Sequence, residues 1–490
     1  MNSALIVILL VLLLSIYLGV QARRGKTMNL EQWSTAGRSF GTLFVFLLSA
    51  GEIYTTFTFL GGSGWAYGKG GPTFYILWYG ALAYILSYWL LPAIWRYAKQ
   101  HNLLSQSDFF VAKYNSPALG VLVSLIGIIA MIPYLVTQLK GLGAIMQIAS
   151  YGSISSTLAV WIGVIAVTIY VMASGVHGTA WTAVLKDGLV LVVVVFLGIY
   201  LPVHYYGGIG QMFHAIDQAK PGYLTLPAKG NSVYWFISTV LLTALGFYTW
   251  PHAFQAVYTA KNEQTFRRNA MVFPLYQLIL LFVFFVGFAA ILTVKPPLQG
   301  SAGDNSLLVL SVQTFPKWVV GLIGASGLLC AIVPGSLLLT TSATMISKNL
   351  YKVINPKASD ESVSRLAHCL VPVVALIALY FTFNGQSIVA LLLMGYSLVT
   401  QFFPAIVFSF MKRNPITKWG AIFGILAGEL VVAYTTITSK TVGLLLPFMP
   451  QWVKDLNIGI VAMVVNLIVT FAVSAFTRSA GAQARSAVNA

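Results

Sequence analysis

The apolar residues of this 490-residue chain fall in long continuous blocks, not in the alternating pattern of half-buried strands. A helix needs about 20 apolar residues to cross a membrane core of roughly 30 Å. Continuous blocks predict helices, because the strands of a membrane barrel would alternate with period two. We predict an all-α membrane protein with about thirteen transmembrane helices. Their predicted ranges are 3–20, 38–62, 73–97, 117–147, 157–175, 181–203, 232–257, 270–294, 315–347, 367–384, 387–411, 416–437 and 456–477.

Two of these blocks carry residues that weaken a helix in the middle. The stretch from Leu47 to Thr56 contains a glycine and the ionisable Glu52. The stretch from Leu241 to Trp250 is similar to it in sequence and is followed at once by Pro251. Interrupted apolar segments in two halves of a chain point to the binding site of a transporter.

The composition and the distribution of charge agree with a membrane protein. Only 8% of the residues are charged, against about 25% in soluble domains. A net charge of +17 would suggest nucleic acid in a soluble protein, but Lys and Arg gather here in every second predicted loop. Such loops stay in the cytoplasm, so we expect the lipid bilayer as the partner and no nucleic acid.

This charge pattern also predicts the orientation. We expect a multi-pass protein of the bacterial inner membrane with the N-terminus outside and the C-terminus in the cytoplasm, which requires an odd number of spans. Arg267 and Lys352 then lie in the cytoplasm, and Lys220 and Lys295 lie outside.

Several short motifs occur in a fixed order along about residues 1–480. They are Gly37-Arg38 with Leu48–Gly51 and the glycine-rich Gly61–Tyr67, then Pro133–Gly141, Trp181-Thr182, Gly246–His252 and the basic loop Ala260–Arg268. In this order they resemble the sodium:solute symporter family.

The resemblance implies a LeuT-like fold in which helices 2–6 and 7–11 form two inverted repeats of five helices. The two interrupted segments are then discontinuous helices that face each other at the centre of the membrane. The implied organisation is an N-terminal anchor helix and cytoplasmic lead-in (1–37), a first repeat (38–203), an extracellular loop (204–231), a second repeat (232–411), two peripheral helices (412–477) and a cytoplasmic tail (478–490).

Away from the ends of the predicted spans, five Lys, Asp or Glu residues lie well inside them: Glu52, Lys140, Lys186, Asp187 and Glu429. Each costs roughly 2.5–3.5 kcal/mol to insert, so such residues are functional by default. The alternative for Lys140, Lys186 and Asp187 is that the side chain reaches the membrane surface. The alternative for Glu429, which lies in a peripheral helix, is that it only packs against the first helix or a partner.

The resemblance implies a second sodium site, and here the sequence departs from the family. The carbonyls of that site would belong to Glu52 and Thr55, but its two hydroxyl positions fall on Val333 and Pro334, which carry no side-chain oxygen. Ser336 is displaced from them by at least two residues and hence lies on another face of the helix.

A lysine close to that site suggests a different coupling ion. Lys186 could place its ammonium where the ion would sit, because a buried lysine titrates readily. We expect Glu52 to be its counter-charge and a proton to drive transport, and Asp187, which follows Lys186 in the chain, is a further candidate for ion coupling. The alternative is that sodium still binds, through backbone carbonyls and Ser336.

The candidate substrate site is centred on Lys140, whose ammonium is suited to a carboxylate. The other candidates for substrate binding are Gln138, Tyr54, Thr55, Tyr248, Trp250 and Gln401. The alternative for the aromatic residues is that they only pack helices together. Within the family the motifs look most like the monocarboxylate branch, which implies lactate, pyruvate or alanine as substrate. Pantothenate and an amino acid are the runner-up substrates.

Other classes of protein are less compatible with the sequence. The six histidines are scattered, so we expect no enzyme, no cofactor and no certain metal site. A channel would show a pore loop, and a sensor would carry a soluble domain. Cys330 and Cys369 lie in apolar blocks, and we expect no disulfide between them.

Overall fold

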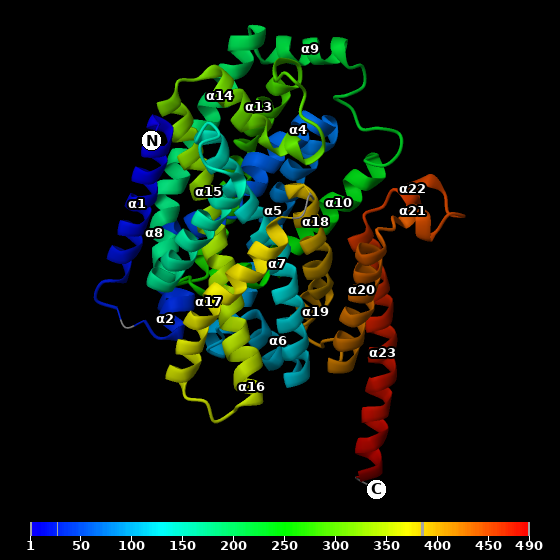
Figure 1. Ribbon diagram of the computed structural model, residues 1–490. Coiled ribbons are helices and arrows are strands. Elements are labelled where there is room, and N and C mark those ends of the chain that lie inside the picture. The colour runs from blue at the N-terminus through cyan, green and yellow to red at the C-terminus, as the bar shows by residue number, and fades with distance from the viewer. Residues whose placement is uncertain (1, 27, 384–386, 489–490) are drawn as a thin grey trace.

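The computed structural model describes residues 2–26, 28–383 and 387–488, and this part of the chain is built of helices (Figure 1). An isolated parallel bridge pairs Phe40 with Ala260. The prediction of an all-α membrane protein is confirmed. In a helix the backbone N–H and C=O groups form hydrogen bonds with one another. Lipid offers these groups no hydrogen-bond partners, so the spanning segments are helical.

The helices that follow the predicted spans make up most of the fold. In chain order they are α1 (Ser3–Arg23), α3 (Thr42–Ala50) with η2 (Phe57–Gly62) and α4 (Ser63–Lys69), α5 (Tyr75–Gln100), α7 (Pro117–Ala149), α8 (Ser156–Tyr206), α10 (Val233–Gly246) with η4 (Phe247–Thr249) and α11 (Pro251–Tyr258), α12 (Gln264–Leu278) with α13 (Leu280–Thr293), α15 (Lys317–Thr344) with η6 (Met345–Tyr351), α17 (Asp360–Thr382), α18 (Ile388–Val399) with η7 (Thr400–Phe402) and α19 (Phe403–Phe408), α20 (Lys418–Thr438), and α23 (Ile458–Val488).

Short helices connect these long ones. They are α2 (Leu30–Thr35), η1 (Ala36–Arg38), η3 (Gly71–Phe74), α6 (Gln106–Tyr114), α9 (Ile209–Ala219), η5 (Gly300–Asn305), α14 (Ser306–Thr314), α16 (Lys352–Ile354), α21 (Val442–Leu445) and α22 (Gln451–Lys454).

The 51-residue helix α8 is too long for one span, since it would measure about 76 Å if straight. At Gly175 its backbone leaves the helical region, with φ 55° and ψ −151°. The hydroxyls of Tyr170 and Thr182, on the two sides of this break, lie 2.7 Å apart. A straight helix would separate these residues by about 18 Å along its axis. The chain therefore reverses direction at Gly175, between the predicted spans 157–175 and 181–203.

The number of membrane-competent helices differs from the predicted number of spans. Within the described residues, ten helices are long and apolar enough to cross a membrane, or eleven if the bent pair α10 and α11 is one span. The predicted count of thirteen is therefore not confirmed. Two features lower this count. It takes α8 as one helix, although the chain reverses within it, and it leaves out α3, η2 and α4 because each of them is too short to cross a membrane.

The centre of the bundle is α15. Of its most apolar 18-residue window, 94% is buried, a larger share than in any other membrane-competent helix of the described chain. Helices α1, α7 and α8 pack around it.

Helices α20 and α23 form a pair at the edge of the bundle (Figure 1). They approach closely at glycines: a β-carbon added at Gly420 would lie 1.9 Å from the Ser474 hydroxyl, and one at Gly424 would lie 1.8 Å from the Thr470 hydroxyl. Small residues allow such close packing between helices in a membrane.

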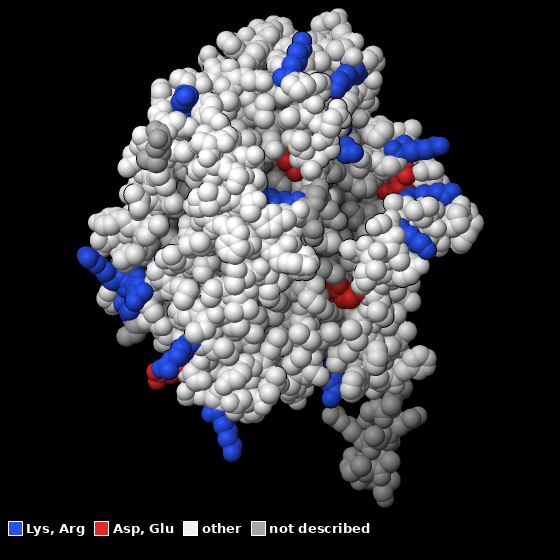
Figure 2. All heavy atoms as spheres, viewed as in Figure 1, with Lys and Arg blue, Asp and Glu red and all other residues white. Residues whose placement is uncertain are grey.

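The connections alternate between two ends of the bundle. Figure 1 shows the N-terminus, α9 and α14 at one end, here the upper end, and α2, α6, α16 and the end of α23 at the opposite, lower end. On the face seen in Figure 2, charged side chains gather toward both ends and few lie across the middle, as a belt in contact with lipid requires.

Two membrane helices are broken at mid-length. The first stops at Ala50, and helical structure resumes with the π-helix η2 at Phe57 and the α-helix α4 at Ser63. The second bends by 48° between η4 and α11, where Trp250 is extended, with φ −66° and ψ 137°. The residue before a proline is pushed out of the helical region, so Pro251 explains the second break.

Candidate functional site

The two breaks meet in space. Glu52 lies in the first break, and His252 follows Pro251 in the second. The Glu52 Oε2 atom lies 2.9 Å from His252 Nε2 and accepts a hydrogen bond of 3.0 Å from the Tyr134 hydroxyl on α7. These three side chains therefore join α7 and both broken helices.

The Glu52 carboxylate is buried, with 9% of its side chain exposed. Its second oxygen, Oε1, has no hydrogen-bond partner in the described part of the chain. A carboxylate inside a membrane is costly unless it is compensated, so this oxygen is a candidate contact for a bound group.

A small enclosed cavity of about 10 Å³ lies beside Glu52. Its other walls are Phe57, Tyr79, Tyr134, Phe247, Trp250, Ala253, Leu392 and Tyr396. The Trp250 ring packs against Tyr134, with centroids 5.2 Å apart, and edge-on against Tyr396 at 5.3 Å. The cavity is large enough for about one water molecule, so a solute enters it only when these rings move apart.

A second cluster of charge lies on α8. The fully buried ammonium of Lys186 is 2.9 Å from the Asp187 carboxylate. It also donates to the backbone carbonyls of Ala50 and Tyr54, at 3.4 and 3.3 Å. Tyr276 of α12 donates to Asp187 at 3.2 Å. The ammonium of Lys186 therefore lies against the broken end of α3.

This geometry corrects one prediction from the sequence. We expected Glu52 to be the counter-charge of Lys186, but the ion pair is formed with Asp187, and Glu52 is bonded to Tyr134 and His252 instead. Glu52 does not pair with Lys186 because its side chain points to α7 and α11, whereas the backbone carbonyls of the break face α8. The alternative that Lys186 reaches the membrane surface is also wrong, since its side chain has no exposed area.

The face of α15 toward the first break is apolar. Val333 packs with Leu47 and Ala183, and a β-carbon at Gly51 would lie 3.2 Å from the Val333 side chain. Pro334 is buried within α15. The Ser336 hydroxyl donates to the Val333 carbonyl and lies 2.7 Å from the Thr179 hydroxyl.

Three further candidates shape the first break. The side chain of Thr55 accepts from the Phe57 amide at 3.1 Å. The Gln138 side-chain oxygen accepts from the Thr56 amide at 3.4 Å. Tyr54 packs edge-on against Tyr276 and so faces the Lys186 cluster rather than the cavity.

The structure places three other predicted substrate residues outside the cavity wall. Tyr248 packs edge-on against Phe247. The Gln401 amide donates to the Ser397 and Gly459 carbonyls. Lys140 is half-buried on α7, between Gln138 and the end of that helix at Ala149.

Lys140 lies within the electrostatic reach of Asp304, a buried residue of η5. Burial raises the pKa of Asp304 to about 6, against the opposing effects of the Ile388 hydrogen bond and of the Lys140 charge. The Asp304 carboxylate accepts from the Ile388 amide, at the start of α18, at 2.9 Å. It thereby ties the connection before α14 to α18.

Sequence reasoning missed several residues of the cavity. Tyr134 and His252 stand inside the motifs Pro133–Gly141 and Gly246–His252, which could have marked them. Tyr79 and Tyr396 stand in ordinary apolar blocks, and only the fold brings them to Glu52. In the described residues no group of three His, Cys, Asp or Glu side chains could hold a metal ion, and both cysteines are free.

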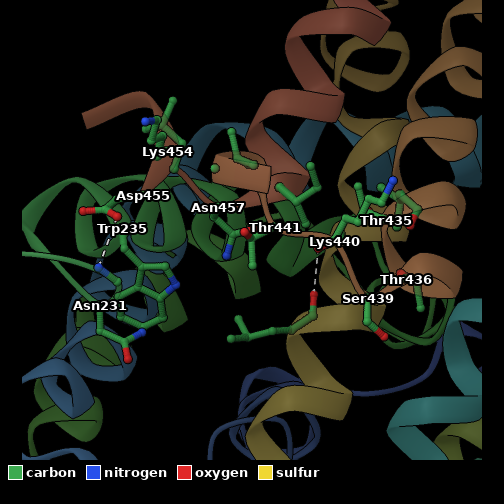
Figure 3. Close-up of a pocket in the computed structure, with 18 of the residues that line it drawn as sticks. Asn231, Trp235, Thr435, Thr436, Ser439, Lys440, Thr441, Lys454, Asp455 and Asn457 are labelled. Carbon is green, nitrogen blue, oxygen red and sulfur yellow. Dashed lines mark hydrogen bonds between the residues drawn. The ribbon is translucent and has the colours of Figure 1, made fainter. Parts of the chain in front are cut away.

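A larger pocket of about 640 Å³ lies near the ends of α10, α18 and α20. Figure 3 shows side chains from these helices and from the segment around Asp455 lining it. Asp455 is used structurally, because it accepts from the Gly230 amide and the Gln451 side chain. This pocket touches neither broken segment, and the cavity beside Glu52 is the better candidate for the transport site.

Comparisons with known proteins agree with this geometry. Residues 3–428 match the model of the sodium:solute symporter family. The chain is 65% identical to the uncharacterized symporter YhjB of Bacillus subtilis over 98% of both chains. It is 27% identical to a monocarboxylate transport permease protein of Rhizobium johnstonii, over 84% of this chain and 82% of that one.

A solved structure shows the same fold. It is the outward-open state of a Na⁺-coupled sialic acid symporter, with a TM-score of 0.78 over 97% of this chain and 98% of that chain. The two are 16% identical, so this likeness concerns the fold, which is LeuT-like.

Proposed function

The chain belongs to the sodium:solute symporter family, and from this membership we propose that it imports a small monocarboxylate, such as lactate, pyruvate or alanine, together with a proton. It is a solute symporter of the membrane and not an enzyme. We place it in the bacterial inner membrane with the N-terminus outside, and we assign residues 38–203 and 232–411 to the two inverted repeats.

The position of Lys186 carries the proposal for the coupling ion. Its ammonium donates to the carbonyls of Ala50 and Tyr54, the backbone groups that a cation at this break would use. Val333 and Pro334 on α15 present no side-chain oxygen there. Loss of the Lys186 proton would remove the positive charge and loosen the break from α8, which links protonation to a change of conformation.

Two observations support the substrate proposal. Lys140 is a cation on α7, the helix that also carries Tyr134. A relative at 27% identity is a monocarboxylate transport permease by name. A charge at the entrance of a site raises the local concentration of a substrate of opposite sign. We assign this role to Lys140.

Sodium is the second candidate for the coupling ion. The family as a whole and the sialic acid symporter of the same fold favour it. In this case the carbonyls near Glu52 and the Ser336 hydroxyl would supply its ligands, and Lys186 would remain a fixed charge. Pantothenate or an amino acid is the second candidate for the substrate.

The test is uptake into proteoliposomes that contain the purified protein. Proton and sodium gradients are imposed separately, and labelled pyruvate, L-lactate, L-alanine and pantothenate are offered in turn. The proposal expects uptake of a monocarboxylate driven by the proton gradient in sodium-free buffer. Uptake that requires sodium at constant pH supports the second candidate.

A variant tests the role of Lys140. Lys140→Ala should raise the KM for the carboxylate on the order of tenfold and leave kcat nearly unchanged, whereas Lys140→Arg should keep the KM. An unchanged KM in Lys140→Ala would contradict this role.

A further inference from the structure

The cavity beside Glu52 is walled by aromatic rings. Tyr79, Tyr134, Phe247, Trp250 and Tyr396 all line it. Aromatic faces attract cations, and cages of such rings are used to recognise ammonium groups. An anion, by contrast, gains nothing from the negative face of a ring.

The one acidic group in this wall is Glu52. Its Oε2 atom receives both hydrogen bonds, from Tyr134 and His252, and its Oε1 atom is buried without a partner among the described residues. A buried charged group of this kind requires a compensating charge.

His252 does not supply that charge. Its Nδ1 atom is buried and has no partner in the described part of the chain. A protonated imidazole would donate from both nitrogens and would leave the Nδ1 hydrogen buried without an acceptor, which is costly. We therefore assign the neutral ring, with the hydrogen on Nε2 directed at Glu52.

Lys186 does not supply it either. Its ammonium is paired with Asp187 and with two backbone carbonyls. The negative charge of Glu52 is thus left for something that enters the cavity.

From this arrangement we propose that the cavity binds the ammonium group of an α-amino acid, between the free oxygen of Glu52 and the faces of Trp250 and Tyr396. This rests on the proposed function and narrows it: among small monocarboxylates, the substrate is one that also carries a positive charge. A plain carboxylate such as lactate would bring a second negative charge next to Glu52.

The test compares two probes of nearly the same shape, L-alanine and L-lactate, which differ in an ammonium against a hydroxyl group. Their binding to the purified full-length protein is measured by isothermal titration calorimetry at pH 7, with and without sodium. We expect L-alanine to bind at least tenfold more tightly than L-lactate. Glu52→Gln should weaken L-alanine binding at least 100-fold and leave L-lactate binding no weaker than in the wild type.

Two variants serve as controls for folding and for the charge itself. Tyr134→Phe removes a hydrogen bond to Glu52 but keeps the carboxylate, so the preference for L-alanine should persist. Glu429→Gln changes a different intramembrane carboxylate, on α20, and should leave both affinities unchanged.

Three results would overturn the inference. Equal binding of L-alanine and L-lactate by the wild type would leave the symport of monocarboxylates standing and remove the ammonium site. Full L-alanine affinity in Glu52→Gln would show that another group holds the ligand. Binding and transport of none of the carboxylates would overturn both this inference and the proposed function.

Discussion

The ammonium of Lys186 lies 3.3 Å from the backbone carbonyl oxygen of Tyr54. One residue belongs to the second half of α8 and the other to the break after α3, so a charged side chain joins two separate helices in the interior. Because the Lys186 side chain is fully buried, its charge depends on Asp187 and on these carbonyls. Removing this charge by mutation should therefore alter the contact between the two helices.

The first prediction concerns stability at this pair. Lys186→Gln leaves the Asp187 carboxylate buried without its cation, and breaking a buried ion pair in this way costs about 3–5 kcal/mol. We expect a clearly lower unfolding temperature for Lys186→Gln in detergent. The double variant Lys186→Gln with Asp187→Asn should recover most of the loss, because no lone charge remains. A single variant as stable as the wild type would mean that Asp187 does not need the Lys186 charge.

The second prediction concerns pH. The pKa of Asp304 is about 6 in the folded protein, above its ordinary value of 3.8. Between these values the folded state binds more protons than the unfolded state, so stability falls as the pH rises from about 4 to about 6. The loss is up to about 3 kcal/mol, since one pKa unit is about 1.4 kcal/mol.

Asp304→Asn should remove this dependence, because the amide oxygen still accepts from Ile388 and carries no charge. The measurement is the unfolding temperature across this pH range, with Asp217→Asn on the exposed side of α9 as the matched control. The same slope in Asp304→Asn and in the wild type would assign the pH dependence to other groups.

The third prediction concerns the reversal of α8. Gly175 has φ 55°, and a β-carbon there would lie 2.5 Å from the Trp33 ring and 2.6 Å from the Trp33 carbonyl oxygen. Gly175→Ala should destabilise the protein by at least about 1–3 kcal/mol, the usual cost of such strain. Gly188→Ala in the same helix is the control, because nothing lies within 4 Å of its added β-carbon. Equal unfolding temperatures for the two variants would argue against the reversal at Gly175.

The fourth prediction concerns orientation. In a background with Cys369→Ser, since Cys369 is exposed, a cysteine placed at Lys220 should react with a membrane-impermeant maleimide in intact cells. One placed at Lys352 should react only after permeabilisation. The reverse pattern would put the N-terminus in the cytoplasm.

The sequence was informative where a residue breaks a local rule. Gly51 with Glu52 and the Trp250–Pro251 pair marked both broken helices, because such residues are costly inside an apolar helix. Lys186 and Asp187 were recognised as ionisable residues in a span, and the structure buries both.

Side-chain direction across the breaks could not be predicted. Helical periodicity gives the face of a residue only while the backbone stays helical, and Glu52 stands where it does not. Its pairing with His252 instead of Lys186 follows from that irregular backbone. Gln401 was expected at the substrate, but it stands in η7 and accepts hydrogen bonds from Asn466 of α23, a contact between distant segments that no local pattern encodes.

The most direct test of the account is whether protons enter with the substrate. Proteoliposomes are loaded with a pH-sensitive dye in sodium-free buffer, and L-alanine is added outside with the membrane potential held at zero. The account predicts acidification of the lumen by the wild type and none by Lys186→Gln. A lumen that stays at constant pH while added sodium drives uptake would contradict it.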